Sequence, residues 1–135
     1  MYIEVDWDDP RPVYQQLSDQ IVERIAAGDI VPGTTLPSVR RLAGELGVNL
    51  HTVHKAFEFL HRAGFVRLQP RLGAVVRSHP IATPDGSRPL RQDLAPLLAR
   101  AWLQGLRRED IIHEVDLVLE RFRASPAQPL PEEGA

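Results

Sequence analysis

Basic side chains that could bind phosphate are concentrated in the middle third of the chain. Residues 36–77 carry six Arg and one Lys against two Glu, a net charge of +5, although the whole chain has a net charge of −2. Residues 1–35 have a net charge of −5 and residues 78–135 a net charge of −2. Contact with a nucleic-acid backbone requires a local basic face of this kind. Charge alone is only suggestive, because many solvated surfaces have the same composition.

The same third of the chain contains a stretch with one polar and one apolar side. On a helix of about 100° per residue, a single arc of about 80° holds only His51, His54, Glu58 and His61. The other side carries Val53, Ala56, Phe57 and Leu60. The N-terminal half of this helix therefore offers donors and acceptors that suit base edges and phosphates in a major groove, from Asn49, His51, Thr52, His54 and Lys55.

The histidines of this stretch have a second possible chemistry. His54, Glu58 and His61 have the spacing i, i+4 and i+7, from which a metal ion can be chelated. The simpler interpretation is that histidines on such a face contact phosphate or water, so no metal site is predicted. The pair Glu109 and Asp110 is explained by the favourable position of acidic residues at a helix N-terminus. Because no nucleophile–base arrangement or glycine-rich phosphate loop is found, we expect no catalytic residue, no cofactor and no enzymatic activity.

The elements that must position these residues are three helices with a tight turn between the last two. Residues 12–27 have apolar side chains at helical spacing, and Gly28 is a suitable C-terminal stop. A loop rich in Gly, Pro and Thr follows. Ser38 is a suitable N-cap for a short helix over 39–46, and Asn49 for a helix over 50–63. Two short helices joined at Gly47 have the spacing of a helix-turn-helix.

A basic hairpin is predicted directly after the third helix. Residues 65–68 and 74–77 have strand composition, and Pro70 and Gly73 bracket the turn between them. A hairpin in this position is the wing of a winged helix-turn-helix. Arginines on the second helix and on the hairpin then flank the polar side of the third helix, namely Arg40, Arg41, Arg67, Arg71 and Arg77.

The C-terminal part is expected to pair two copies of the chain. Residues 1–77 form the predicted winged helix-turn-helix domain, residues 78–89 a linker, residues 90–123 a two-helix segment (90–104 and 108–123), and residues 124–135 a disordered tail. Two amphipathic helices cannot bury their apolar stripes within one monomer, so we expect a homodimer. The predicted dimerisation residues are Leu94, Leu97, Leu98, Ala101, Ile111, Val115, Val118, Leu119 and Phe122. The predicted fold class is mainly α with a small antiparallel β wing.

Several classes of protein are disfavoured by composition. No apolar run approaches the ~20 residues of a membrane span, so no membrane partner is expected. The N-terminus is acidic where a secretory signal would be basic and then apolar. The absence of cysteine excludes disulfides and thiolate metal sites. A cytoplasmic location is the default expectation.

On these residues the chain resembles the GntR family of regulators, and within it the short YtrA-like branch. The resemblance runs from about Pro12 to Phe122. Its signatures are PVYQQLSDQI, the loop GDIVPG, the block LPSVRRLAGELGVNLHTVHKAFEFLHRAGFV and a degenerate wing, RLGAVV. Larger family members bind metabolites or carry an aminotransferase-like domain. The two helices here are too small for either, which matches the branch in which a helical pair mainly dimerises.

The resemblance also implies roles for particular residues. It implies that Arg40 contacts phosphate or a base, that residues 49–55 read the major groove, and that Gly73 lets the wing backbone approach the minor groove. This chain departs from the family at Arg71, where a first wing glycine is usual, and at Ala74, where Thr is usual. Leu50 and His54 stand where some relatives have Arg. The operator sequence therefore cannot be transferred from relatives.

The expected function is sequence-specific binding of double-stranded operator DNA as a homodimer on an inverted repeat, with repression as the expected outcome and any small-molecule effector unknown. Two alternatives remain open. The first is a winged-helix module for protein–protein contact, which would need exposed apolar anchors; on the outward face of residues 50–63 the only one expected is Leu50. The second is a metal-responsive regulator that uses His54, Glu58 and His61.

Overall fold

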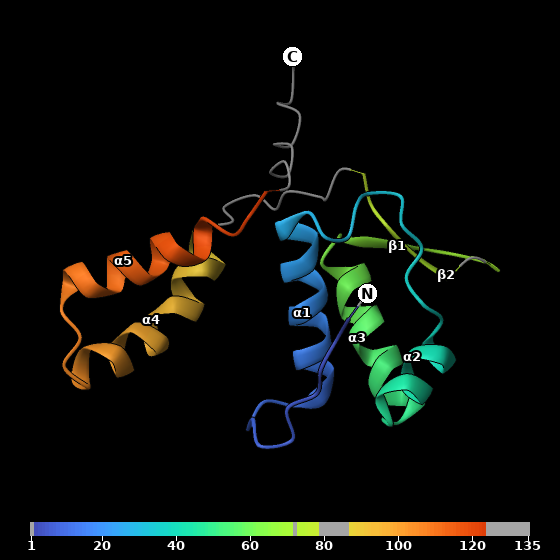
Figure 1. Cartoon of the computed structure of the whole chain (residues 1–135), viewed down its shortest axis with the longest axis horizontal. Helices are drawn as coiled ribbons and strands as arrows, with labels where there is room; N and C mark the ends of the chain where they lie inside the picture. The colour runs from blue at the N-terminus through green and yellow to red at the C-terminus, as the bar shows by residue number, and fades with distance from the viewer. Residues whose placement is uncertain (1, 72, 79–86, 124–135) are drawn as a thin grey trace, which may run out of the picture.

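The computed structural model describes residues 2–71, 73–78 and 87–123. In these residues five helices and two strands follow one another, arranged as in Figure 1. They are α1 (Val13–Ala27), α2 (Val39–Leu46), α3 (Leu50–Arg62), β1 (Val66–Gln69), β2 (Gly73–Val76), α4 (Ser87–Leu103) and α5 (Arg108–Leu119). The predicted fold class is confirmed. The predicted tail, 124–135, and most of the predicted linker lie outside the described residues.

The core of the N-terminal unit lies between α1 and α3, with α2 packed against α3. The apolar stripe predicted for the first helix is buried at Leu17, Ile21 and Ile25. The apolar side predicted for α3 is also buried, at Val53, Ala56, Phe57 and Leu60. Burial of these side chains, at about 25 cal/mol per Å² of apolar surface, provides the main driving force for folding of this unit. Ile3, Ile30 and Leu36 join the same core from irregular segments, whose sequence has no periodicity that predicts burial.

The turn between α2 and α3 has the predicted caps. The Ser38 hydroxyl accepts a hydrogen bond from the Arg41 backbone N–H at 3.1 Å and begins α2. Gly47 ends α2 with a φ of 68°, in the left-handed region that a side chain would disfavour. The Asn49 Oδ1 atom then accepts from the His51 N–H at 2.8 Å and begins α3. Local hydrogen bonding therefore fixes where the polar face of α3 starts.

The wing is an antiparallel pair in which Val66 faces Val76 and Gln69 faces Gly73. Its strands begin and end within a residue of the predicted ones. The loop before α2 also pairs with β2, which the sequence did not predict. Thr35 forms an isolated antiparallel bridge with Val75, and the Leu36 N–H donates to the Ala74 carbonyl at 2.8 Å. The base of the wing is thereby tied by backbone hydrogen bonds to the segment that leads into α2.

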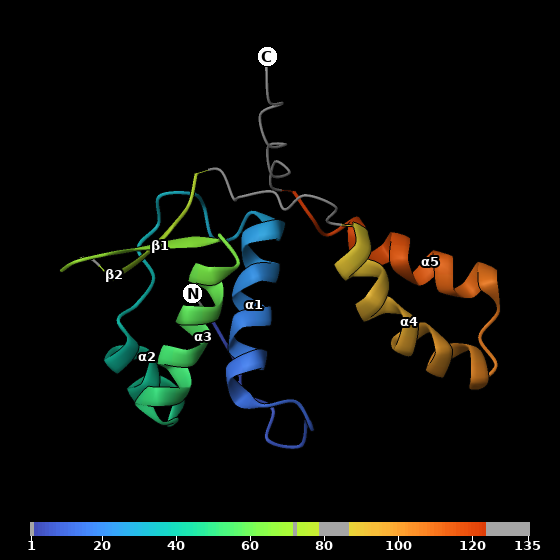
Figure 2. The same cartoon turned by 180° about the vertical axis from the view of Figure 1, so that it is seen from behind.

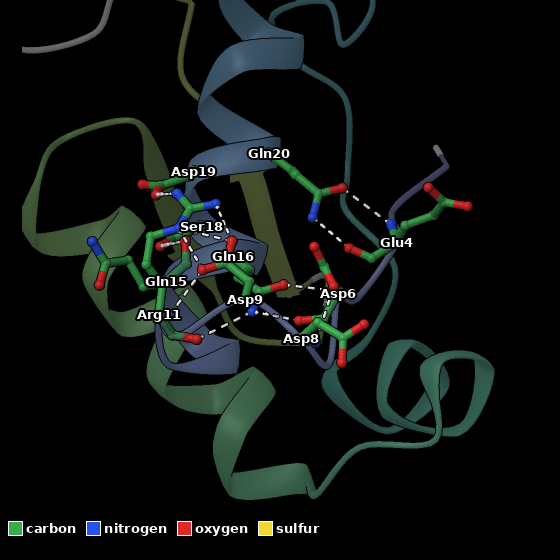
Figure 3. A network of polar contacts seen from close by, with 10 residues as sticks. All are labelled: Glu4, Asp6, Asp8, Asp9, Arg11, Gln15, Gln16, Ser18, Asp19 and Gln20. Atoms are coloured by element: carbon green, nitrogen blue, oxygen red, sulfur yellow. Dashed lines mark hydrogen bonds and ion pairs between the residues drawn. The ribbon is translucent and has the colours of Figure 1, made fainter. Parts of the chain in front are cut away.

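An N-terminal arm, residues 2–11, is held against α1 by two glutamines one turn apart (Figure 3). Gln16 Oε1 accepts from the Asp6 N–H at 2.9 Å, and its Nε2 donates to the carbonyls of Asp6 and Arg11 at 3.0 and 3.1 Å. Gln20 likewise accepts a hydrogen bond from the Glu4 N–H through Oε1 and donates one to the Glu4 carbonyl through Nε2. Gln16 is buried, so its amide replaces water for the arm's backbone groups.

An ion-pair cluster closes the end of the arm. Arg11 contacts Asp9 at 2.8 Å and Asp19 at 3.0 Å. The hydrogen bonds from Arg11 lower the pKa of Asp9 below its ordinary value. Burial raises the pKa of Asp19, against the effect of the same arginine. These contacts join the arm to α1 on the surface, where single ion pairs contribute little.

Replacement of Gln16 by Ala is expected to destabilise the protein by about 2 kcal/mol, because it leaves backbone groups of the arm without partners in a part-buried position. Urea unfolding followed by circular dichroism measures this change. Gln15→Ala is the matched control, because Gln15 is the exposed neighbour on the same helix. Equal stabilities of the two variants would show that the hydrogen bonds between Gln16 and the N-terminal arm are unimportant for folding.

The helical pair α4–α5 lies on the side of α1 away from α2 and the wing (Figures 1 and 2). α4 begins at Ser87, three residues before the predicted helix and inside the predicted linker. The helix can begin there because Pro89 falls in the first turn, where backbone N–H groups form no hydrogen bond within the helix and the missing N–H of proline costs nothing. α5 ends at Leu119 rather than at residue 123. None of the described helices is long and apolar enough to cross a membrane.

The two units touch where the chain leaves α5. The Arg123 N–H donates to the Ala26 carbonyl, near the end of α1, at 2.8 Å. A Cβ placed on Gly28 would lie 3.6 Å from the Arg123 Cβ, so the two backbones approach closely there. The helical pair is therefore in contact with the winged helix at this point.

Candidate nucleic-acid interface

The N-terminal half of α3 presents the polar face that the sequence predicted. His51, His54 and Lys55 are exposed and Thr52 is partly exposed, whereas Val53 and Ala56 between them are fully buried. The Asn49 oxygen is used by the helix cap, so its amide NH₂ remains as the group that can reach a ligand. The structure thus brings all five predicted residues to one end of one helix.

The two arginines at the start of α2 differ in their surroundings. The Arg41 Nε atom lies 2.9 Å from the Glu45 Oε1 atom, one turn further along the helix. Arg40 is exposed and forms no ion pair within the described part of the chain. Because Glu45 offsets much of the charge of Arg41, Arg40 is the stronger of the two candidates for a phosphate contact.

Lys55 is held by a residue that the sequence analysis did not include in the interface. Its Nζ atom lies 4.1 Å from the centre of the Tyr14 ring, which is in the first turn of α1. Such a cation–π contact restrains a flexible side chain without neutralising its charge. The two residues are far apart in the sequence, so only the packing of α1 on α3 reveals the pairing.

The wing carries the remaining predicted residues. Arg67 on β1 and Arg71 at the turn are exposed, and Gln69 with its oxygen facing Arg67 accepts from that guanidinium at 3.0 Å. Arg71 has a φ of 72° and is the one non-glycine residue with positive φ among the described residues. This conformation costs about 1 kcal/mol for a residue with a side chain, which explains why glycine suits the position. Gly73, with a φ of 90° and no atom within 4 Å of an added Cβ, lies exposed beside it.

The histidines do not assemble a metal site. The His54 Nδ1 atom lies 3.7 Å from Glu58 Oε1, but no group of three His, Cys, Asp or Glu residues within the described ranges is arranged to hold a metal ion. The metal-responsive alternative therefore has no assembled group of three ligands to support it in this part of the chain.

One expectation about α3 was wrong. Leu50 is 44% exposed, as predicted, but Phe59 is 47% exposed as well. Phe59 lies about 100° around the helix from the centre of the buried side, and so reaches solvent at its flank. The outward surface of α3 therefore carries two apolar side chains rather than one.

The α4–α5 pair encloses an apolar groove of about 370 Å³. Eight of the nine predicted dimerisation residues line it, together with Leu106 and Glu114: Leu94, Leu97, Leu98, Ala101, Ile111, Val115, Val118 and Leu119. Only four of these are even partly buried, and no residue of α5 is buried. Phe122 is absent from the groove because α5 ends before it, and it lies instead beside α1. A second apolar pocket, of about 410 Å³, is lined by Trp102 and Ile112 among others, and neither was among the predicted dimerisation residues.

Comparison with known proteins agrees with this geometry. Residues 13–76 match the family described as "Bacterial regulatory proteins, gntR family". The HTH-type transcriptional regulator Rv1152 of Mycobacterium tuberculosis is 39% identical over 75 residues, 56% of this chain and 62% of that protein. The HTH-type transcriptional repressor YtrA of Bacillus subtilis is 39% identical over 64 residues, 47% of this chain and 49% of that protein. The matches span less than two thirds of these relatives.

Solved structures extend the similarity beyond the winged helix. A transcriptional antiterminator from Listeria monocytogenes has the same fold over 96% of this chain and 98% of its own, with a TM-score of 0.80 and 20% identity. The DNA-binding domain of AraR in complex with operator ORX1 covers 56% of this chain and 98% of its own, with a TM-score of 0.51 and 28% identity.

YtrA from Sulfolobus acidocaldarius, a GntR-family transcription factor, is 38% identical with a TM-score of 0.60. The similarity covers 73% of this chain and 99% of that structure. The match is therefore longer than the winged helix of this chain and covers nearly all of that structure. This chain belongs to the GntR family of DNA-binding transcription regulators, in its YtrA-like branch.

Proposed function

We propose that the protein represses transcription by binding an inverted-repeat operator as a homodimer. The observation that carries this proposal is the exposed polar end of α3, a helix that is contacted both by α2, which carries Arg40, and by the first strand of the basic wing. An α-helix fits the major groove, and donors on its N-terminal half reach base edges. The AraR DNA-binding domain, which is similar to this chain, is in complex with an operator, and this supports operator DNA as the partner. A protein seated on a promoter blocks polymerase without further machinery, and the Bacillus subtilis relative is named a repressor.

Phosphate contact and base reading are assigned to different residues. Arg40, Lys55, Arg67 and Arg71, with a smaller contribution from Arg41, would hold the DNA backbone through charge. Asn49, His51, Thr52 and His54 would face the base edges, where they discriminate sequence. Gly73 would let the wing backbone approach the minor groove.

The homodimer follows from the apolar groove on α4–α5. Its residues remain exposed in one copy of the chain, and an exposed apolar surface of this kind indicates an interface. Pairing with a second copy by a two-fold axis would remove the groove from water and present two α3 helices on successive major grooves, about 34 Å apart. The area of dimer contact would thus be supplied by residues 87–119, while residues 2–77 bind DNA.

Selection from a random duplex library tests the proposal. We expect enrichment of a two-fold symmetric sequence whose half-sites lie about one helical turn apart. Enrichment of an asymmetric sequence would contradict the two-fold arrangement. Absence of any enrichment, even in dilute buffer, would favour the protein–protein module, for which Leu50 and Phe59 are the available anchors on α3.

His51→Ala is expected to reduce discrimination between the operator and a site with one changed base pair by about tenfold, with little effect on binding to unrelated DNA. The reason is that this exposed side chain at the start of α3 is proposed to recognise base edges and not to neutralise phosphate charge. Fluorescence anisotropy with the three duplexes measures it. His61→Ala, at the far end of the same helix, is the control. If both variants keep the parental preference, His51 does not read bases.

A further inference from the structure

A pocket of about 360 Å³ lies where the winged helix meets the end of the helical pair. Its walls come from the outer surface of α1, the loop after it and the segment after α5: Gln20, Glu23, Arg24, Ala27, Asp29, Arg121 and Phe122. The volume is within the range of small-molecule sites, and junctions between structural units are frequent places for them. No role in DNA contact or in the apolar groove accounts for this set of residues.

The α1 wall connects the pocket to the recognition helix. Gln20, Glu23, Arg24 and Ala27 have the spacing i, i+3, i+4 and i+7, so they form one stripe on the surface of α1. A separate stripe of the same helix, Leu17, Ile21 and Ile25, is buried in the core shared with α3. A molecule held by the outer stripe therefore contacts the helix on which α3 rests.

The opposite wall belongs to the end of the dimerisation segment. Phe122 was expected in the dimer interface, but here its ring lines the pocket and is 38% exposed. The hydrogen bond from the Arg123 N–H to the Ala26 carbonyl fixes this wall against α1. Phe122 provides an apolar surface on this wall and Ala27 one on the α1 wall, whereas Arg121 provides a guanidinium on the same segment as Phe122.

The Arg24 side chain identifies the polar group that the pocket would take. Its Nε atom is buried and has no hydrogen-bond partner among the described residues. Because that atom is shielded from solvent, a ligand would meet the other nitrogens of the Arg24 guanidinium together with Arg121, which lines the same pocket. A carboxylate is the acceptor that matches these planar groups. Glu23 and Asp29 on the same rim balance the two arginines, which disfavours ligands with several negative charges.

We propose that this pocket binds a small monocarboxylate with an apolar body and that the bound acid regulates operator affinity. The regulatory half of this proposal rests on the proposed function; the binding half does not. A ligand that bridges α1 and the end of α5 favours one orientation of the helical pair relative to the winged helix. Because the pair sets the distance between the two α3 helices in the dimer, that orientation changes the fit to two half-sites.

Amide NMR titration of the full chain with benzoate tests binding. We expect chemical-shift changes at Gln20, Arg24 and Ala27, and none with benzyl alcohol, which has the same ring without the charge. Inorganic phosphate, an anion without an apolar body, is expected to give much weaker changes. Sodium chloride keeps the ionic strength constant in every titration. Equal response to benzyl alcohol, or no response to benzoate at these amides, would overturn the site.

Arg24→Gln is expected to weaken benzoate binding at least about tenfold, because it removes one charge-assisted contact. Arg121→Gln serves as a second variant, since Arg121 is exposed and its replacement leaves the core intact. Arg100→Gln on α4, outside the pocket, is the matched control. Unchanged benzoate affinity in both Arg24→Gln and Arg121→Gln would exclude the pocket as the binding site.

The regulatory half is tested by operator affinity with and without benzoate at constant ionic strength. We expect a change of about five- to tenfold that is lost in Arg24→Gln. Benzoate binding without any change in operator affinity would overturn regulation while the site stands. Failure of the proposed function itself looks different, because the protein would then ignore duplex DNA whether benzoate is present or absent.

Discussion

Raising the salt concentration from 50 to 200 mM is expected to weaken operator binding by about a thousandfold. Among the proposed phosphate-binding residues, Arg40, Lys55 and Arg71 are exposed cations with neither an ion pair nor a side-chain hydrogen bond within the described residues, whereas Arg67 is engaged by Gln69. A homodimer presents each of these three residues twice. Six phosphate contacts release enough counterions for a slope of about −5 in a plot of log affinity against log salt. Fluorescence anisotropy over a series of salt concentrations measures this slope. A slope no steeper than about −2 would reject the multi-phosphate interface.

The Arg40→Ala variant measures how much of the salt dependence of binding comes from one residue. The substitution removes one contact from each subunit, so we expect the slope to become less negative by about 2 and the affinity to fall about 10- to 100-fold on every DNA sequence. Arg100→Ala on α4 is the control of equal charge and should leave both quantities unchanged. Loss of affinity for the operator alone would instead mean that Arg40 reads a base.

Val115→Asp is expected to convert the dimer into monomers and to lower operator affinity at least about 100-fold. Val115 lines the apolar groove and is 42% exposed in one copy of the chain, so the new carboxylate is tolerated by the monomer but would be buried unpaired in the dimer. A monomer loses the second half-site and with it the gain from two linked binding events. Sedimentation velocity and anisotropy measure the two effects.

Leu103→Asp is the matched control for this change. Leu103 is also apolar and lies at the end of α4, but it is 85% exposed and does not line the groove. We expect it to remain dimeric and to bind DNA normally. Dimers that persist in Val115→Asp would place the interface elsewhere, with the surface around Trp102 and Ile112 as the next candidate.

The winged helix could be predicted from the sequence because each of its elements carries a local signal. Ser38, Gly47 and Asn49 mark the helix ends by their own backbone chemistry, and the spacing of Val53, Phe57 and Leu60 defines the buried side of α3. The structure therefore differs from the predicted boundaries of these elements by only one residue. The polar face of α3 is then defined as well, because it is the side of the helix opposite the buried residues.

The parts that could not be predicted depend on contacts between distant residues. Nothing near Lys55 in the sequence points to Tyr14, and nothing near Asp6 points to Gln16. The pairing of Arg41 with Glu45 has the ordinary helical spacing and could have been anticipated. Phe122 continued the apolar periodicity of α5, but periodicity does not determine where a helix stops. Its position beside α1 therefore became visible only in the structure.

The backbone bridge between the loop before α2 and β2 joins two parts of the proposed DNA-facing surface by main-chain hydrogen bonds. Through it, the entry to α2 with Arg40 and the hairpin with Arg71 share a single hydrogen-bonded strand edge at Thr35 and Val75. The separation of the two Cα atoms that carry these cations is thus governed by main-chain geometry. Lengthening the loop by one residue would shift both anchors relative to α3 at once, so natural insertions should be better accepted at the wing tip than at this junction.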